Sequence, residues 1–176
     1  MNKKYTIALS LIIIGALSIF FLGYKSILNN NVPSLQVLRA NTTVKPFDTK
    51  DIDGKPYVFK QQDGITIYEV FASWCLPCRK SVPETIKFSK ENNIKVTGIA
   101  YRDLDFEIKK FQKKYGSFDK TILSNGKVEN ALKIANVPQT IFVSNDKVLY
   151  RIYGQPTAEN LKEVLLLVKR ELSSSN

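Results

Sequence analysis

Two cysteines, spaced to react with each other, are the residues of this sequence best suited to chemistry. They lie in Trp74-Cys75-Leu76-Pro77-Cys78, and the 176-residue chain has no other cysteine and no histidine. Two thiols can form one disulfide or one reactive dithiol, but they cannot complete the usual four-ligand zinc site. The lack of histidine excludes a Ser-His or Cys-His catalytic pair and a histidine metal ligand. The composition therefore favours thiol chemistry without a metal.

The cysteines fall at the predicted junction of a strand and a helix. Residues 65–72 form a β-rich apolar run, and a helical pattern extends from the cysteines to about residue 92. Free N–H groups and the positive dipole end lower the pKa of a thiol at a helix N-terminus. We expect Cys75 to gain this effect, to stay exposed and to act as the nucleophile. Cys78, one turn further on, is then the resolving thiol.

A structural disulfide and half of a metal site are the alternatives to a redox pair. A disulfide between residues three apart closes a very small loop, so it restricts the unfolded chain little and stabilises weakly. A metal site lacks further soft ligands, since these are the only cysteines. A redox-active cysteine pair is therefore the favoured interpretation.

The elements that must position the pair are predicted from hydrophobic periodicity and turn signals. We expect strands at residues 56–59, 65–72, 94–101, 140–144 and 148–153, and helices after the cysteines and at 104–115, 128–135 and 157–172. Parallel pairing through the crossovers, with one terminal hairpin, predicts an α/β fold in which helices cover a mixed central sheet.

The N-terminal segment predicts a membrane anchor. Residues 5–24 include no charged side chain, and a helix of that length reaches about 30 Å, the thickness of the hydrocarbon core of a bilayer. Lys3 and Lys4 precede it, so the positive-inside rule keeps residues 1–4 cytoplasmic and sends the following chain across the membrane. We therefore predict one transmembrane helix, a signal anchor, at residues 5–24.

A cleaved signal peptide is the alternative, because such peptides have a shorter apolar region that ends at a small-residue site. The best site, Ala16-Leu17-Ser18, is followed by more apolar residues, which favours the uncleaved anchor. Either way the rest of the chain is exported. Residues 25–45 show no hydrophobic periodicity and are predicted to be a linker. This leaves one folded domain at residues 46–176.

The formal net charge is +10, from 26 basic and 16 acidic residues. The lysines are scattered along predicted helices and are not massed with aromatic residues, and the domain is predicted to be exported. We therefore expect a solvated basic surface and no nucleic-acid partner.

From about residue 46 onward the chain resembles the thioredoxin superfamily. The resemblance rests on residues 71–79, which contain both cysteines, on Pro83, which matches the proline that kinks the first long helix of the family, and on Val137-Pro138-Gln139-Thr140. It implies a thioredoxin-like fold in which the Val137–Pro138 bond is cis and its loop lies beside the dithiol. Trp74, Val137 and Pro138 are then expected to contact a substrate peptide that lies extended across the cysteines.

More narrowly, the chain resembles the membrane-anchored DsbE/CcmG thiol:disulfide interchange proteins of cytochrome c maturation and their TlpA/ResA relatives, through the anchor and residues 98–103, 136–143 and 150–154. The resemblance implies a single-pass protein of the bacterial inner membrane whose catalytic domain faces the periplasm. It implies a disulfide reductase without a cofactor that keeps the haem-attachment cysteines of apocytochrome c reduced, directly or through a maturation thiol protein. It also implies re-reduction by a membrane thiol reductant of the CcdA/DsbD type.

Two positions depart from that pattern. Relatives often carry a glutamate that is thought to tune the dithiol where this chain has Ser81. Glu69, six residues before Cys75, instead matches the buried acid position of thioredoxin itself. In the middle of an apolar strand a carboxylic acid is desolvated and its pKa rises, so Glu69 is a candidate proton shuttle for Cys78. The alternative is that Glu69 lies at the strand edge and meets water.

Other functions on the same fold stay open. A general periplasmic disulfide reductase would have the same site. An oxidase would need a stabilised thiolate, which Leu76-Pro77 and the lack of histidine disfavour. A non-enzymatic copper-carrying assembly factor would bind Cu(I) through both thiolates, although histidine, a usual further ligand, is absent.

Overall fold

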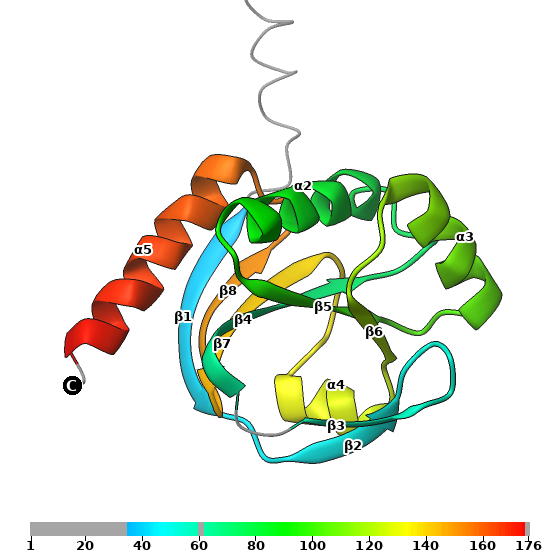
Figure 1. Ribbon diagram of the computed structural model, residues 1–176, viewed down its shortest axis with the longest axis horizontal. Helices are drawn as coiled ribbons and strands as arrows, with labels where there is room; N and C mark the ends of the chain where they lie inside the picture. The colour runs from blue at the N-terminus through cyan, green and yellow to red at the C-terminus, as the bar shows by residue number, and fades with distance from the viewer. Residues whose placement is uncertain (1–34, 60–61, 175–176) are drawn as a thin grey trace, which may run out of the picture. The chain divides into compact units, whose positions relative to one another are not determined.

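The computed structural model describes residues 35–59 and 62–174, and the compact unit that they form begins at Leu35. Figure 1 shows its elements. The strands are β1 (Gln36–Thr43), β2 (Phe47–Lys50), β3 (Pro56–Phe59), β4 (Gln62–Phe71), β5 (Lys95–Ala100), β6 (Lys120–Leu123), β7 (Gln139–Asn145) and β8 (Lys147–Tyr153). The helices are α2 (Cys78–Glu91), α3 (Asp105–Tyr115), α4 (Gly126–Leu132) and α5 (Ala158–Ser174).

The main sheet is mixed, as predicted. Its strand order is β1-β8-β7-β4-β5-β6, while β2 and β3 form a separate hairpin. The pairs β4–β5 and β5–β6 are parallel, whereas β4–β7, β7–β8 and β1–β8 are antiparallel. Strand β4, which leads into the cysteines, therefore lies inside the sheet with a partner on each side.

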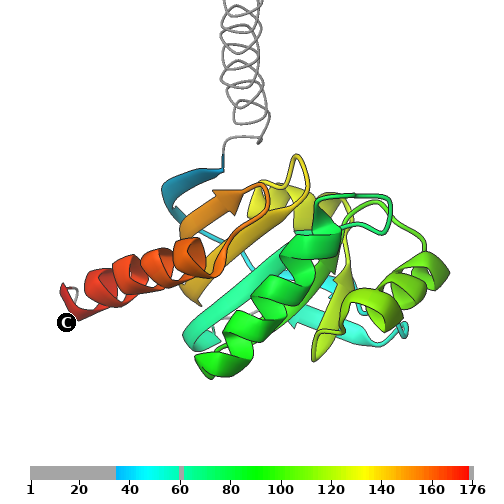
Figure 2. The same cartoon turned by 90° about the horizontal axis from the view of Figure 1, so that it is seen from above.

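Helices cover both faces of this sheet. Figures 1 and 2 show α2, α3 and α5 on one face, and α4 with the β2–β3 hairpin on the other. Alternation along β4 sends Ile67 and Phe71 into the core under α2, and Tyr68 and Val70 into the core under α4. Glu69 alternates with the same residues as Ile67 and Phe71 and so lies on their face of the sheet. The strand therefore directs its carboxylate toward α2.

Most of the predicted elements are confirmed, with ends shifted by a few residues. The strands predicted at 56–59, 65–72, 94–101, 140–144 and 148–153 correspond to β3, β4, β5, β7 and β8. Helix α2 contains Pro83. Thr157 caps α5, because its Oγ accepts the backbone N–H of Asn160 at 3.3 Å.

The predicted linker at residues 25–45 is wrong over its second part. Gln36–Thr43 is strand β1, which pairs with β8 at the edge of the main sheet, so the folded unit starts well before residue 46. The side chains of β1 are nearly all exposed, so the strand has no alternating apolar pattern and is held mainly by backbone pairing. The short strands β2 and β6 were also missed, and β6 separates the two helices that were predicted to be consecutive.

The predicted anchor at residues 5–24 and the residues before it lie outside the described part of the chain. Among the residues that are described, no helix is long and apolar enough to cross a membrane.

A close contact beside β4 gives a test of this packing. Gly98 of β5 is paired with Glu69, and a Cβ built on it would lie 2.4 Å from a ring carbon of Phe118. Because that ring is itself packed in the core, we expect Gly98→Ala to lower the free energy of unfolding by about 1–3 kcal/mol in urea denaturation.

Gly126→Ala is the matched control, since the same methyl group at the start of α4 meets nothing within 4 Å. It should be neutral or slightly stabilising. Equal unfolding free energies for the Gly98→Ala variant and the parent would contradict the packing described here.

Candidate active site at the junction of β4 and α2

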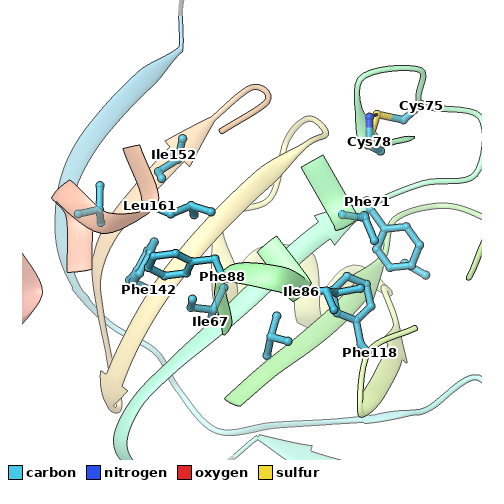
Figure 3. Packing of buried hydrophobic residues seen from close by; sticks show 14 of the residues in the cluster. Ile67, Phe71, Cys75, Cys78, Ile86, Phe88, Phe118, Phe142, Ile152 and Leu161 are labelled. Carbon is cyan, nitrogen blue, oxygen red and sulfur yellow. Dashed lines mark hydrogen bonds between the residues drawn. A yellow bond between two sulfur atoms is a disulfide. The ribbon is translucent and has the colours of Figure 1, made fainter. Parts of the chain in front are cut away.

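The two cysteines form a disulfide at the N-terminus of α2. Their Cα atoms are 5.3 Å apart, and Cys78 is the first residue of the helix (Figure 3). Pro77 precedes it with helical dihedral angles, φ −62° and ψ −27°, so the proline fits the helix start where no N–H is needed. The backbone N–H of Cys78 donates to Sγ of Cys75 at 3.3 Å. A free N–H of the helix terminus is therefore directed at the sulfur predicted to be the nucleophile, where it can stabilise a thiolate.

The prediction that Cys75 stays exposed is wrong for this disulfide form. Cys75 exposes 4% of its surface and Cys78 none, and both belong to the buried core cluster. The residues on either side of Cys75 are open to solvent, with Trp74 60% and Leu76 67% exposed. Trp74 and Leu76 are therefore the exposed apolar side chains on either side of Cys75.

Glu69 is fully buried beneath the first turns of α2, so the alternative of a water-exposed strand edge is wrong. Three hydroxyl groups donate to its carboxylate: those of Ser81, Thr85 at 3.2 Å and Thr140 at 2.7 Å. Burial raises the pKa of Glu69 to about 7, because the charged form loses hydration that the three hydrogen bonds only partly replace. Its side chain can therefore hold or release a proton near neutral pH.

Ser81, where the resemblance leads us to expect a glutamate, donates to Glu69. The carboxylate under this turn of α2 thus comes from strand β4, and the helix supplies a hydroxyl partner. The structure brings together the two departures from the family pattern, which are neighbours in space and separated by twelve residues in sequence.

The Val137–Pro138 peptide bond is cis, as the resemblance implied. Val137 packs against the core cluster that contains both cysteines. The carbonyl of Pro138 accepts the N–H of Gly154 at 3.1 Å, and Thr140, two residues further on, donates to Glu69. The proline loop is therefore tied to the acid beneath α2 as well as to β8.

A buried arginine that the sequence reasoning missed supports the same loop. Arg151 is 5% exposed, and its guanidinium donates to the carbonyl of Leu132 and, at 3.4 Å, to the side-chain oxygen of Gln139. Gln139 in turn donates to the carbonyl of Asn136 at 2.8 Å. Burial lowers the pKa of Arg151, because the cation is desolvated. The available signal was a charged residue at an inward position of the apolar strand at 148–153.

Among the residues that the structure describes, no group of three or more His, Cys, Asp or Glu side chains could hold a metal ion. The disulfide of the site can be exchanged for two thiols, next to a carboxylic acid whose pKa is raised to about 7.

Comparison with known proteins agrees with this geometry. Residues 28–165 match the Redoxin family. Thiol:disulfide interchange protein CycY of Rhizobium leguminosarum bv. viciae is 31% identical over 105 residues, which are 58% of this chain and 56% of CycY. Thiol-disulfide oxidoreductase ResA of Bacillus thuringiensis subsp. konkukian is 28% identical over 125 residues, 68% of this chain and 72% of ResA.

A solved structure supports the fold. The thiol:disulfide interchange protein of the thioredoxin family from Chlorobium tepidum superimposes with a TM-score of 0.61 at 20% identity, over 73% of this chain and 96% of that one. With its cysteine pair at the strand–helix junction and a cis-proline loop, the chain belongs to the Redoxin family and is a thioredoxin-superfamily thiol:disulfide oxidoreductase of the DsbE/CcmG/ResA type.

Proposed function

We propose that this protein is a membrane-tethered disulfide reductase of the bacterial periplasm that keeps the haem-attachment cysteines of apocytochrome c reduced, directly or through a maturation thiol protein. The observation that carries the reductase assignment is the Cys75–Cys78 pair at the N-terminus of α2 above the buried Glu69. The substrate and the location follow from the resemblance to the DsbE/CcmG and ResA proteins and from the uncharged segment at residues 5–24.

The reaction begins from the reduced pair. The thiolate of Cys75 attacks one sulfur of the substrate disulfide, and the other substrate sulfur leaves as a thiolate. Cys78 then loses its proton and attacks Sγ of Cys75, which releases the second substrate thiol. Two electrons have passed to the substrate, and the protein is left with the Cys75–Cys78 disulfide. A membrane thiol reductant of the CcdA/DsbD type restores the dithiol.

Glu69 is the proposed proton acceptor for Cys78. A resolving thiol that is fully buried cannot pass its proton directly to bulk water, and Glu69 is a buried base whose pKa of about 7 suits this step. The three hydroxyl groups around the carboxylate fix its position between β4, α2 and β7.

The electrostatics of the site favour reduction over oxidation. Strongly oxidising members of the superfamily stabilise the thiolate of their reduced form. Here the chain has no histidine to add a positive charge, and ionisation of Glu69 places a negative charge in the core beneath the pair. This negative charge disfavours a thiolate in the reduced pair, so the dithiol gives up its electrons more readily.

Trapping tests the proposed substrate. Cys78→Ala leaves the attacking thiol without its resolving partner, so the full-length protein expressed in a bacterium should accumulate mixed disulfides through Cys75, identified by mass spectrometry after acid quenching. We expect apocytochrome c or a protein of its maturation among the trapped species.

Cys75→Ala is the control and should trap none of these proteins, because it removes the attacking thiol and the remaining Cys78 has no exposed surface. A trapped set that lacks both apocytochrome c and its maturation proteins would overturn the specific substrate and leave a general reductase.

Substitution of the buried acid tests the proton transfer. We expect Glu69→Gln to slow insulin disulfide reduction at pH 7 by about tenfold or more, and to remove the rise in rate with pH that the parent shows near pH 7. Glu91→Gln makes the same change at the exposed end of α2 and should keep the parental profile. A Glu69→Gln profile identical to that of the parent would eliminate the role.

The same variant has a second readout that does not require activity. Glu69 holds its proton up to about pH 7 in the folded protein, but only to about its ordinary pKa of 4.5 in the unfolded chain. The folded state therefore binds more protons in this interval, and the free energy of unfolding contributed by Glu69 falls by about 3 kcal/mol as pH rises through it. Urea denaturation of the parent minus Glu69→Gln should show that slope, and a flat difference would mean that Glu69 is not buried in its protonated form.

A further inference from the structure

Three consecutive residues at the end of β5, Tyr101, Arg102 and Asp103, reach both loops around the disulfide, and the mechanism above does not use them. Asp103 makes the first connection. Its carboxylate accepts the backbone N–H of Ser73 and, at 2.9 Å, the Ser73 hydroxyl. Ser73 lies two residues before Cys75, so an acid from the loop that follows the neighbouring strand β5 fixes the backbone that leads into the cysteines.

Arg102 makes the second connection through its backbone. Its carbonyl accepts the indole N–H of Trp74 at 3.4 Å. Arg102 has φ 47°, in the left-handed region that residues other than glycine rarely adopt. The conformation therefore needs support from its surroundings.

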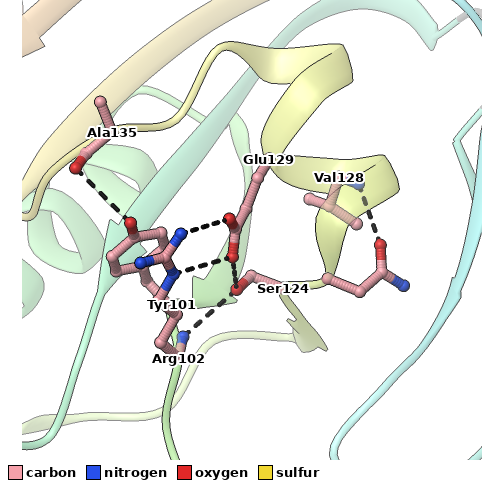
Figure 4. Close-up of polar contacts among 7 residues, drawn as sticks. Tyr101, Arg102, Ser124, Val128, Glu129 and Ala135 are labelled. Atoms are coloured by element: carbon pink, nitrogen blue, oxygen red, sulfur yellow. Dashed lines mark hydrogen bonds and ion pairs between the residues drawn. The ribbon is translucent and has the colours of Figure 1, made fainter.

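Helix α4 and the segment before it supply that support, as Figure 4 shows. The Ser124 hydroxyl oxygen accepts the N–H of Arg102 at 3.2 Å, and the guanidinium pairs with Glu129 at 3.0 Å. The same guanidinium lies 4.9 Å from the ring centroid of Tyr101. Ser124 also donates to Glu129 at 3.1 Å, which closes the network.

Tyr101 makes the third connection, to the opposite side of the site. Its side chain is buried, and its hydroxyl donates to the carbonyl of Ala135 at 3.5 Å. Ala135 immediately precedes Asn136, where the cis-proline loop begins. One three-residue segment thus contacts the loop that carries Trp74 and Cys75 and also the loop that carries Pro138.

We propose that Tyr101–Asp103 is a clamp that sets the separation of these two loops, with Asp103 as a positioning residue that holds Ser73, and through it Trp74 and Cys75, in place to receive a polypeptide disulfide. The proposal rests on the proposed function, in which those loops are the two walls of the substrate site. Asp103 does not touch the reacting sulfurs in this account. It acts through Ser73, so its loss weakens substrate binding more than it slows exchange.

Trp74 is a built-in reporter, because it is the only tryptophan in the sequence. We expect Asp103→Ala to lower the fluorescence anisotropy of Trp74 and to raise KM for insulin about tenfold while kcat stays within about twofold, with dithiothreitol as the electron donor. Asp103→Asn should restore part of both values, because its amide oxygen can accept the Ser73 N–H and its NH₂ group can donate to the Ser73 hydroxyl oxygen, although that NH₂ group can no longer accept the Leu104 N–H.

Asp105→Ala is the matched control. It removes an exposed acid two residues further on, at the first turn of α3, and so weakens the start of that helix without removing a contact to Ser73. We expect the parental anisotropy and the parental KM. If Asp103→Ala does not fold, Ser73→Ala removes the hydroxyl half of the contact and should raise KM about two- to threefold with the same loss of anisotropy.

Parental anisotropy and KM in Asp103→Ala would overturn the clamp. A fall in kcat with KM unchanged would overturn it as well, since that pattern indicates a purely structural role or a role in the exchange step. Failure of the parent itself to reduce insulin would count against the proposed function alone, because the anisotropy comparison among the Asp103 variants needs no turnover.

Discussion

The carboxyl group of Glu69 is the interaction on which the arrangement of this site depends. A buried carboxylate is costly unless its oxygens are satisfied, and here hydroxyl groups of α2 and β7 satisfy them. Those two elements carry the disulfide and the cis-proline loop, and β4 carries Glu69 itself. The polar cluster therefore joins β4, α2 and β7 at one point in the core. These three elements must keep the same relative positions while the cysteines cycle between thiol and disulfide. Aliphatic packing alone would place these elements close together but would not set the protonation chemistry beneath them.

Around that centre the active-site loops are held by polar contacts from outside the apolar cores. Arg151 supports the cis-proline loop through Gln139, while Arg102 and Asp103 hold the segment that enters the cysteines. This division suits a redox protein, since hydrogen bonds of fixed direction define the position of a loop that has few buried apolar side chains of its own. The exposed Trp74 and Leu76 are then presented on a rigid frame.

The reactive residues of the site could be predicted from the sequence better than the contacts that hold them in place. Cys75, Cys78, the cis bond at Pro138 and the burial of Glu69 could be predicted, because each leaves a local motif or an anomaly, such as an acid inside an apolar run. Strand β1 could not, because an edge strand with exposed side chains has no hydrophobic period. Two hydrogen bonds could not be predicted, because they join segments that are distant in sequence and depend on the folded topology. They are the bond from Ser81 to Glu69 and the bond from Ser73 to Asp103. The burial of Cys75 was missed because its place in the core cluster depends on the folded topology.

The buried acid beneath the pair and the absence of histidine define a dithiol that should give electrons to its substrate. The most direct test of this claim is the reduction potential of the Cys75–Cys78 pair, measured at pH 7 by equilibration with dithiothreitol or glutathione buffers. We expect a value near that of thioredoxin, about −270 mV. A value near that of the strong oxidant DsbA, about −120 mV, would contradict it and would make the protein an oxidase.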